Sequence, residues 1–339
     1  MSRSAIWHSL AEVPPDLGPT AVSIGNYDGV HLGHREVLAQ LCRHAAARGI
    51  APVALTFWPH PRHVMGNADA PPLLTDHADR DRLLLLAGAR GVLDLEFTRE
   101  FAQHSPEDFV RIFLVEGLGA TCVVLGADAL FGRANSGDIH TMRDLGEKYG
   151  FEVVTVADLG PDGASDGRIS SSAIRRAILA GDVAQAARML GRPHTVTDVV
   201  HHGHRRGREL GFPTANLGPQ PSGLIPADGV YAGRLTAVEQ APEHCGVPAL
   251  SGAPCTISVG TNPTFAPGAD GPVRTVEAYV HDDHDLDLYG DTVRIEFLAL
   301  QRPTLRFDSV EALIEQMHED VEVTRRTLAA EAGSAATGS

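Results

Sequence analysis

The segment GNYDGVHLGH (25–34) is the first part of the chain whose residue types could do chemistry. It sets His31 and His34 three residues apart, directly after an apolar run. Imidazole groups can donate hydrogen bonds to phosphate oxygens, and glycine lets the backbone approach a phosphate closely. The glycines of the segment are Gly25, Gly29 and Gly33. Two other interpretations stay open: surface histidines beside a turn, and a zinc site that lacks a nearby third ligand.

A second candidate site lies in the segment RGRELGFPTANL (206–217). The Thr214 hydroxyl and the Asn216 side-chain carbonyl are hard oxygen ligands, which suit Mg²⁺ bound together with ATP phosphates. A turn cluster, in which proline and asparagine have only their ordinary backbone roles, is the alternative. A histidine tract just before this segment could hold a metal: His201, His202 and His204.

Glu277 in the segment TVEAYV (275–280) is a further candidate, because a carboxylate can act as a general base. Two-residue alternation puts Thr275, Glu277 and Tyr279 on one face of a strand, so a solvent-facing strand residue is the alternative. Arg175 could bind phosphate, but with Arg176 it could equally belong to a solvated helix face.

The elements that must position these residues change character along the chain. In the first half, apolar runs predict strands at 21–25, 52–57, 121–126 and 152–156. Helical patterns fall at 33–48, 80–91, 105–118 and 171–182. Gly49 is the expected C-cap of the first helix, and Ser105-Pro106 is a helix start. This alternation predicts a parallel sheet with helices on both faces, in which ligands bind beyond the carboxyl ends of the strands.

The second half predicts an antiparallel β-barrel or sandwich, because strand-like runs alternate there with Gly/Pro/Asn loops. A last helix follows, with a capping-box pattern at Asp308 and Glu311. We therefore expect a first domain over 1–186, a second over 187–330 and a disordered tail over 331–339.

Composition narrows the class of protein. The 339 residues suit two domains, and the formal net charge of −15 argues against binding of nucleic acid through phosphates. The N-terminal segment has no apolar stretch of signal-peptide length, and no run is long enough to span a bilayer, which predicts a cytoplasmic protein without a membrane partner. The four cysteines lack metal-like spacing and are expected as reduced thiols, although a Cys245–Cys255 disulfide stays open.

Taken together, the motifs resemble prokaryotic bifunctional riboflavin kinase/FAD synthetases. The segment at 25–34 resembles the H-x-G-H signature of nucleotidylyltransferases, and TFWPHP (56–61), GADALFGRANSGD (126–138) and RISSSAIR (168–175) resemble later motifs in the family's order. Two further segments, TNPTF (261–265) and 275–290, resemble kinase motifs. The chain departs from the family pattern at Trp58, where an acid is usual, at Ala129, where an aromatic is usual, and at Ser172, which replaces threonine.

The resemblance implies a Rossmann-like nucleotidylyltransferase domain followed by a riboflavin kinase-like β-barrel with a terminal helix. His31 and His34 would hold the ATP triphosphate while the FMN phosphate attacks the α-phosphorus in line and pyrophosphate leaves. Further nucleotide or phosphate contacts are implied in this domain for Gly25, Asp28, Gly29, Gly33, Asp128, Arg168, Ser171, Ser172 and Arg175.

In the barrel, the resemblance makes Glu277 the catalytic base that takes the proton of the ribityl 5′-hydroxyl. Thr214 and Asn216 would bind Mg²⁺ and nucleotide. Glycines expected at the nucleotide are Gly203, Gly207 and Gly211. The expected partners are ATP, riboflavin, FMN and FAD, with Mg²⁺ as the cofactor. Two alternatives remain: a riboflavin kinase whose adenylylating half is weakened, and a flavin-binding regulator without enzymatic activity.

Overall fold

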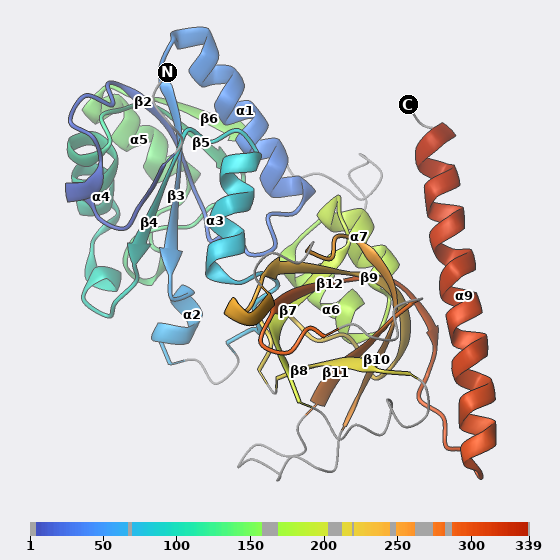
Figure 1. The fold of residues 1–339 in the computed structure, drawn as a ribbon. Helices are drawn as coiled ribbons and strands as arrows, with labels where there is room; N and C mark the ends of the chain where they lie inside the picture. Colours follow the sequence, from blue (N-terminus) through green and yellow to red (C-terminus); the bar gives the residue numbers. More distant parts are fainter. Residues whose placement is uncertain are drawn as a thin grey trace. The chain divides into compact units, whose positions relative to one another are not determined.

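The structure is a computed structural model that describes residues 5–66, 70–157, 169–202, 212–218, 220–244, 249–261, 274–281 and 287–337. The chain divides into two compact units, Met1–Ser171 and Ser172–Ser339. The first unit holds a parallel sheet and the second a closed antiparallel barrel (Figure 1). Both predicted architectures are confirmed.

The first unit alternates strands and helices along the chain. Its strands are β1 (Ala5–Trp7), β2 (Thr20–Ile24), β3 (Ala51–Trp58), β4 (Gly91–Glu96), β5 (Ala120–Gly126) and β6 (Glu152–Val156). Its helices are α1 (Leu32–Arg48), α2 (Pro61–Val64), α3 (His77–Leu86), α4 (Pro106–Phe109) and α5 (Ile139–Tyr149), with a π-helical segment η3 (Val110–Gly117) continuing α4. Short 3₁₀ turns are η1 (Leu10–Glu12), η2 (Phe101–Gln103) and η4 (Arg133–Asn135).

The sheet runs in the order β1-β4-β3-β2-β5-β6 and all of its pairings are parallel. Apolar side chains cover both of its faces, because alternate strand residues pack on different helices. Leu38, Leu41 and Leu84 of α1 and α3 share one core. Phe109 and Leu114 of α4 and η3 share the other. Because both faces of the sheet are buried, its strands are continuous apolar runs in the sequence.

Local signals fix most of these elements. Gly49 ends α1 with a φ of 66°, and the Ser105 hydroxyl accepts the Asp108 N–H at 3.0 Å at the start of α4, as the sequence predicts. The helix predicted over 80–91 is misplaced, since Asp76 caps α3 and Gly91 already begins β4. Strands β1 and β4 have no counterpart among the predicted strands, because β1 is three residues long and the predicted helix ran into β4.

The second unit begins with helices α6 (Ser171–Leu179, its first residue in the first unit) and α7 (Val183–Leu190). Its strands are β7 (His194–His201), β8 (Thr214–Leu217), β9 (Gly229–Glu239), β10 (Ala253–Thr261), β11 (Arg274–Val280) and β12 (Thr292–Arg302). A 3₁₀ turn η5 (Pro242–His244) and a last helix α9 (Val310–Thr337) complete the described elements.

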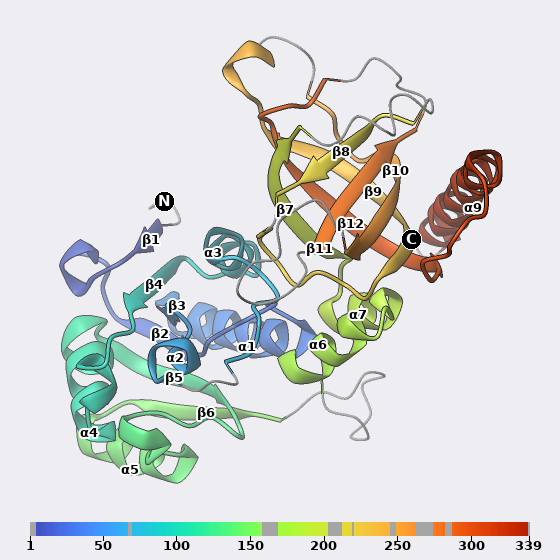
Figure 2. The same ribbon diagram turned by 90° about the horizontal axis from the view of Figure 1, so that it is seen from below.

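The barrel order is β10-β11-β8-β7-β12-β9, and every pairing is antiparallel. Its interior is filled by inward-facing residues such as Val196, Tyr231, Ile257 and Phe297. Figure 2 shows the strands closed into a barrel, with α9 alongside them. Helix α9 contacts β9, β10 and β12, which places the C-terminal helix on the outside of the barrel.

Three predicted boundaries differ from the structure. Helices α6 and α7 group with the barrel rather than with the first unit, because α7 packs on β7 and β12 and Val183 joins the barrel core. The division therefore lies after Ser171 instead of after 186. Helix α9 continues to Thr337, past residue 331, where the sequence predicted the start of a disordered tail; the alanines of this segment favour helix. The Ser309 hydroxyl, not Asp308, accepts the Ala312 N–H at 3.1 Å at the helix start.

No helix among the described residues is both long enough and apolar enough to cross a membrane.

Candidate functional sites

The loop between β2 and α1 carries the two histidines of the first unit. Its backbone is unusual, because Gly29 has a φ of 84° and the non-glycine residues Tyr27 and Val30 have φ values of 51° and 37°. Non-glycine residues in this region are strained and persist only where the surroundings hold them. Here the Tyr27 hydroxyl donates to Ser23 Oγ at 2.7 Å, and burial raises the pKa of that phenol. The loop is therefore held in one shape.

His31 is the N-cap of α1, which the sequence did not reveal. Its Nδ1 accepts the His34 backbone N–H at 3.3 Å. In the neutral ring the proton then lies on Nε2, so this atom is a hydrogen-bond donor. The rings of His31 and His34 stack with centroids 3.6 Å apart, and Tyr27 meets His34 edge-on at 5.3 Å. The structure thus brings both predicted histidines together at the positive end of a helix of 17 residues.

Two of the predicted phosphate-binding glycines leave room for rings of the loop itself. A Cβ at Gly33 would lie 3.2 Å from the His31 ring, and one at Gly25 would lie 3.0 Å from the Tyr27 ring. Gly29 supplies a left-handed backbone conformation instead. The glycines therefore have a packing role that their spacing alone does not show.

Asp28 anchors the loop to the segment before α3. The buried carboxylate accepts the backbone N–H groups of Leu74 at 2.9 Å and Thr75 at 3.3 Å, while Gly29 donates its N–H to Thr75 Oγ1. This role could not be read from the sequence, because residues 74 and 75 carry no motif. The predicted nucleotide contact of Asp28 stays a prediction beside it.

Ser171 joins the same loop from the far end of the unit, where its hydroxyl donates to the Asp28 carbonyl oxygen at 2.9 Å. Ser172 and Arg175 follow on α6, in the second of the two compact units, and Arg175 is buried. Arg175 is therefore not on a solvated helix face. Arg168 lies outside the described residues.

The remaining first-unit positions lie at the end of β3 and just after β5. Asp128 is exposed, and a Cβ at Gly126 would lie 3.3 Å from its carboxylate. Ala129 is half-buried against one core of the sheet. Trp58, which departs from the family pattern, stacks on His77 with ring centroids 4.6 Å apart.

In the second unit, the register of the barrel pairs the predicted residues directly. Asn216 on β8 lies opposite Glu277 on β11, and Thr214 lies opposite Tyr279. Side chains directly opposite each other in an antiparallel pair lie within about 5.5 Å at Cβ. Two motifs far apart in the sequence thus form one group of polar side chains.

These residues face outward from the barrel, because their neighbours Ala215 and Ala278 fill its interior. This outward face of the barrel is not fully exposed to solvent. Glu277 is half-buried, and Tyr279 packs with Phe212 beneath Val321 of α9. Glu277 is therefore not simply a solvent-facing strand residue.

Thr214 and Asn216 fit a hard cation by donor type and by placement. The Asn216 amide donates to the Thr214 carbonyl at 3.0 Å and to its Oγ1 at 3.2 Å, which holds the two side chains together. Neutral oxygens in such a pair suit a metal that arrives with nucleotide phosphates. Gly203, Gly207 and Gly211, together with His204, lie outside the described residues.

Comparisons with known proteins agree with this two-part arrangement. The family model described as FAD synthetase matches residues 13–173, and the model described as riboflavin kinase matches 190–328. A bifunctional riboflavin kinase/FMN adenylyltransferase from Listeria monocytogenes is 35% identical over 305 residues, covering 90% of this chain and 91% of the relative. The protein of that name from Escherichia coli K12 is 31% identical over 319 residues, covering 94% and 95%.

A solved structure of similar fold is a crystal structure described as a macrolide-efflux protein from Streptococcus pneumoniae. It aligns with a TM-score of 0.80 and 29% identity, covering 95% of this chain and 99% of that one. With both family models and the relatives matching nearly the whole chain, the chain belongs to the bifunctional riboflavin kinase/FMN adenylyltransferase family.

Proposed function

We propose that this chain makes flavin cofactors in two ATP-dependent steps in the cytoplasm. The barrel phosphorylates riboflavin to FMN, and the parallel-sheet unit adenylylates FMN to FAD with release of pyrophosphate. The observation that carries the proposal is the cross-strand pair of Glu277 and Asn216, with Thr214 beside them, in a chain whose other unit holds His31 and His34 stacked at a helix start.

In the adenylylation step, an FMN phosphate oxygen attacks the α-phosphorus of ATP and the bond to the β-phosphate oxygen breaks. Little proton transfer is needed, so positioning and charge stabilisation supply most of the rate. His31 offers an Nε2–H donor at the positive end of α1, where a phosphate is favoured. Arg168 and Arg175 would neutralise the charge of the leaving pyrophosphate, and the Ser171 and Ser172 hydroxyls would donate hydrogen bonds to it.

In the kinase step, the riboflavin 5′-hydroxyl oxygen attacks the γ-phosphorus of ATP and ADP leaves. Glu277 would accept the hydroxyl proton, and its half-buried carboxylate lies beside the residues proposed to face the nucleotide. Thr214 and Asn216 would hold Mg²⁺. When bound, the ion supplies charge neutralisation at the ATP phosphates.

The first experiment is a chromatographic time course with purified protein, riboflavin, ATP and Mg²⁺. We expect FMN to rise and then to convert to FAD. The Glu277→Gln variant should make no FMN but should still convert supplied FMN to FAD. The His31→Ala variant should make FMN from riboflavin but should not convert FMN to FAD. FMN formation unchanged in Glu277→Gln would remove the role given to that carboxylate.

The second candidate function is a riboflavin kinase with a weakened first unit. Two observations favour considering it: Trp58 is engaged in a stack with His77, and the small Ala129 packs on the sheet core. The same time course separates the two, because this candidate gives FMN without FAD. Flavin binding with neither product would instead indicate a regulator.

A further inference from the structure

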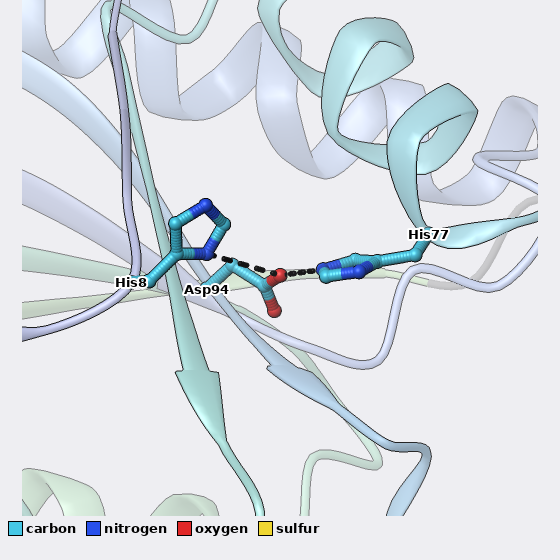
Figure 3. A group of neighbouring side chains, drawn as sticks. All are labelled: His8, His77 and Asp94. Carbon is cyan, nitrogen blue, oxygen red and sulfur yellow. Dashed lines mark hydrogen bonds and ion pairs between the residues drawn. The ribbon is translucent and has the colours of Figure 1, made fainter.

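A cluster of titratable side chains lies at one edge of the parallel sheet, apart from the residues proposed above to act on ATP or flavin. Figure 3 shows His8, just after β1, and His77, at the start of α3, pointing toward Asp94 of β4 from different elements. Their nearest ligand atoms all lie within 4.8 Å of one another. His77 Nε2 contacts Asp94 Oδ2, and His8 Nδ1 lies 4.0 Å from the same oxygen.

The cluster carries an excess of negative charge in a buried place. The carboxylates of Asp81 and Asp94 are 3% and 1% exposed, and the Arg80 guanidinium, at 3.2 and 2.8 Å, is the cation paired with both. With neutral histidines and both carboxylates ionised, the sum is two negative charges and one positive, a net charge of −1. Burial raises the pKa of Asp81 to about 6, so this sum applies above that pH. Buried carboxylates need a positive partner, so a further cation is favoured beside Asp94.

The geometry leaves one side of Asp94 turned to the histidines. Arg80 pairs with Oδ1, whereas Oδ2 faces His77 and His8. The side chains are 60% exposed at His8 and 32% at His77, so a metal ion can reach them from solvent and His8 can rotate. The Arg80 guanidinium, hydrogen-bonded to Oδ1, would then orient the Asp94 carboxylate for metal binding through Oδ2.

We propose that His8, His77 and Asp94 form a binding site for a divalent transition-metal ion, with zinc as the metal that suits the set. Two imidazoles, one carboxylate and water are a common zinc coordination set. Ligand atoms in a tetrahedral zinc site lie about 3.4 Å apart, which follows from bonds of about 2.1 Å. His8 Nδ1 lies farther than that from Asp94 Oδ2, at 4.0 Å, and the exposed His8 ring is the ligand that can move inward. His77 Nε2 and Asp94 Oδ2 lie closer than that, so this contact would open to admit the ion.

The test is titration calorimetry of the full chain with zinc chloride, without flavin or nucleotide. We expect one zinc ion per chain to bind at this site. The zinc affinity of the site should fall more than about tenfold in His8→Ala and in His77→Ala. The control is His63→Ala, because His63 is an exposed histidine of the same unit outside the cluster. Zinc bound elsewhere stays in all variants, so the difference between variants reports on this site.

A second readout uses the two tryptophans, which both flank the cluster. Trp7 precedes His8, and the Trp58 ring stacks on His77. Nickel ions should therefore quench the intrinsic fluorescence of the parent chain but not that of His8→Ala. Equal zinc isotherms and equal quenching in parent and His8→Ala would overturn the proposal. Neither measurement depends on flavin turnover, so its failure differs from a failure of the proposed function.

Discussion

His31 combines two roles in one side chain, and substitutions can separate them. Its Nδ1 caps α1, and its Nε2 is the atom proposed to meet the triphosphate. We expect His31→Asn to keep the helix cap, because asparagine is among the best N-caps, yet to lose FAD synthesis by about 100-fold. His31→Ala should lose both the activity and about 1 kcal/mol of stability. Thermal unfolding and FAD formation from supplied FMN measure the two effects, and an active His31→Asn would contradict the phosphate role.

His194 links the stability of the barrel to pH. It is 2% exposed, and burial lowers its pKa from 6.5 to about 4 although its ring nitrogen bonds the Leu224 carbonyl at 2.6 Å. Because the unfolded chain binds the proton more tightly, the stability supplied by neutral His194 is complete above pH 6.5. It is lost as the pH falls towards 4.

We therefore expect the free energy of unfolding to fall by about 2 kcal/mol between pH 7.5 and pH 5 through this residue alone. In His194→Gln, this part of the pH dependence of the free energy of unfolding should disappear. Denaturant unfolding of both proteins at the two pH values measures it. If the free energy of unfolding of His194→Gln falls as much as that of the parent between the two pH values, His194 is not the source of this pH dependence.

At the scale of elements, closure of the barrel depends on a close approach of β9 to β12. A Cβ at Gly233 would lie 2.2 Å from the Glu296 carbonyl oxygen and 2.3 Å from Ile257 Cδ1. Gly233→Ala should therefore destabilise the barrel by about 1–3 kcal/mol. Gly260→Ala on β10 is the matched control, since nothing lies within 4 Å of its Cβ position. Thermal unfolding compares them, and similar losses in both would contradict the steric account.

For the whole molecule, the two activities are assigned to different sets of residues, and FMN is the product of one activity and the substrate of the other. We expect FMN to pass through solvent. A mixture of Glu277→Gln and His31→Ala chains should therefore make FAD from riboflavin, although neither variant does so alone. The time course of the mixture measures this, with each variant alone as control. No FAD from the mixture would indicate that FMN must stay on one chain.

The two-part architecture and the strands β2, β3, β5 and β6 could be predicted from the sequence alone, and the sequence also singled out the histidines and the PTAN segment (213–216) as candidate sites. Apolar periodicity and capping residues act within one segment, through backbone hydrogen bonds to near neighbours, so their pattern can be read locally. The caps at Gly49 and Ser105 show this. Ser309 shows its limit, because the neighbouring Asp308 fits the same local rule.

Which side chains meet could not be predicted from the sequence and became visible in the three-dimensional fold. The pairing of Glu277 with Asn216, the anchoring of Asp28 by residues 74 and 75, and the group around Asp94 each join separate segments. Such contacts depend on strand order and register, which no local period encodes. The packing of α7 with the barrel has the same cause, because a helix joins the core that buries its apolar face, and that core is formed by strands later in the chain.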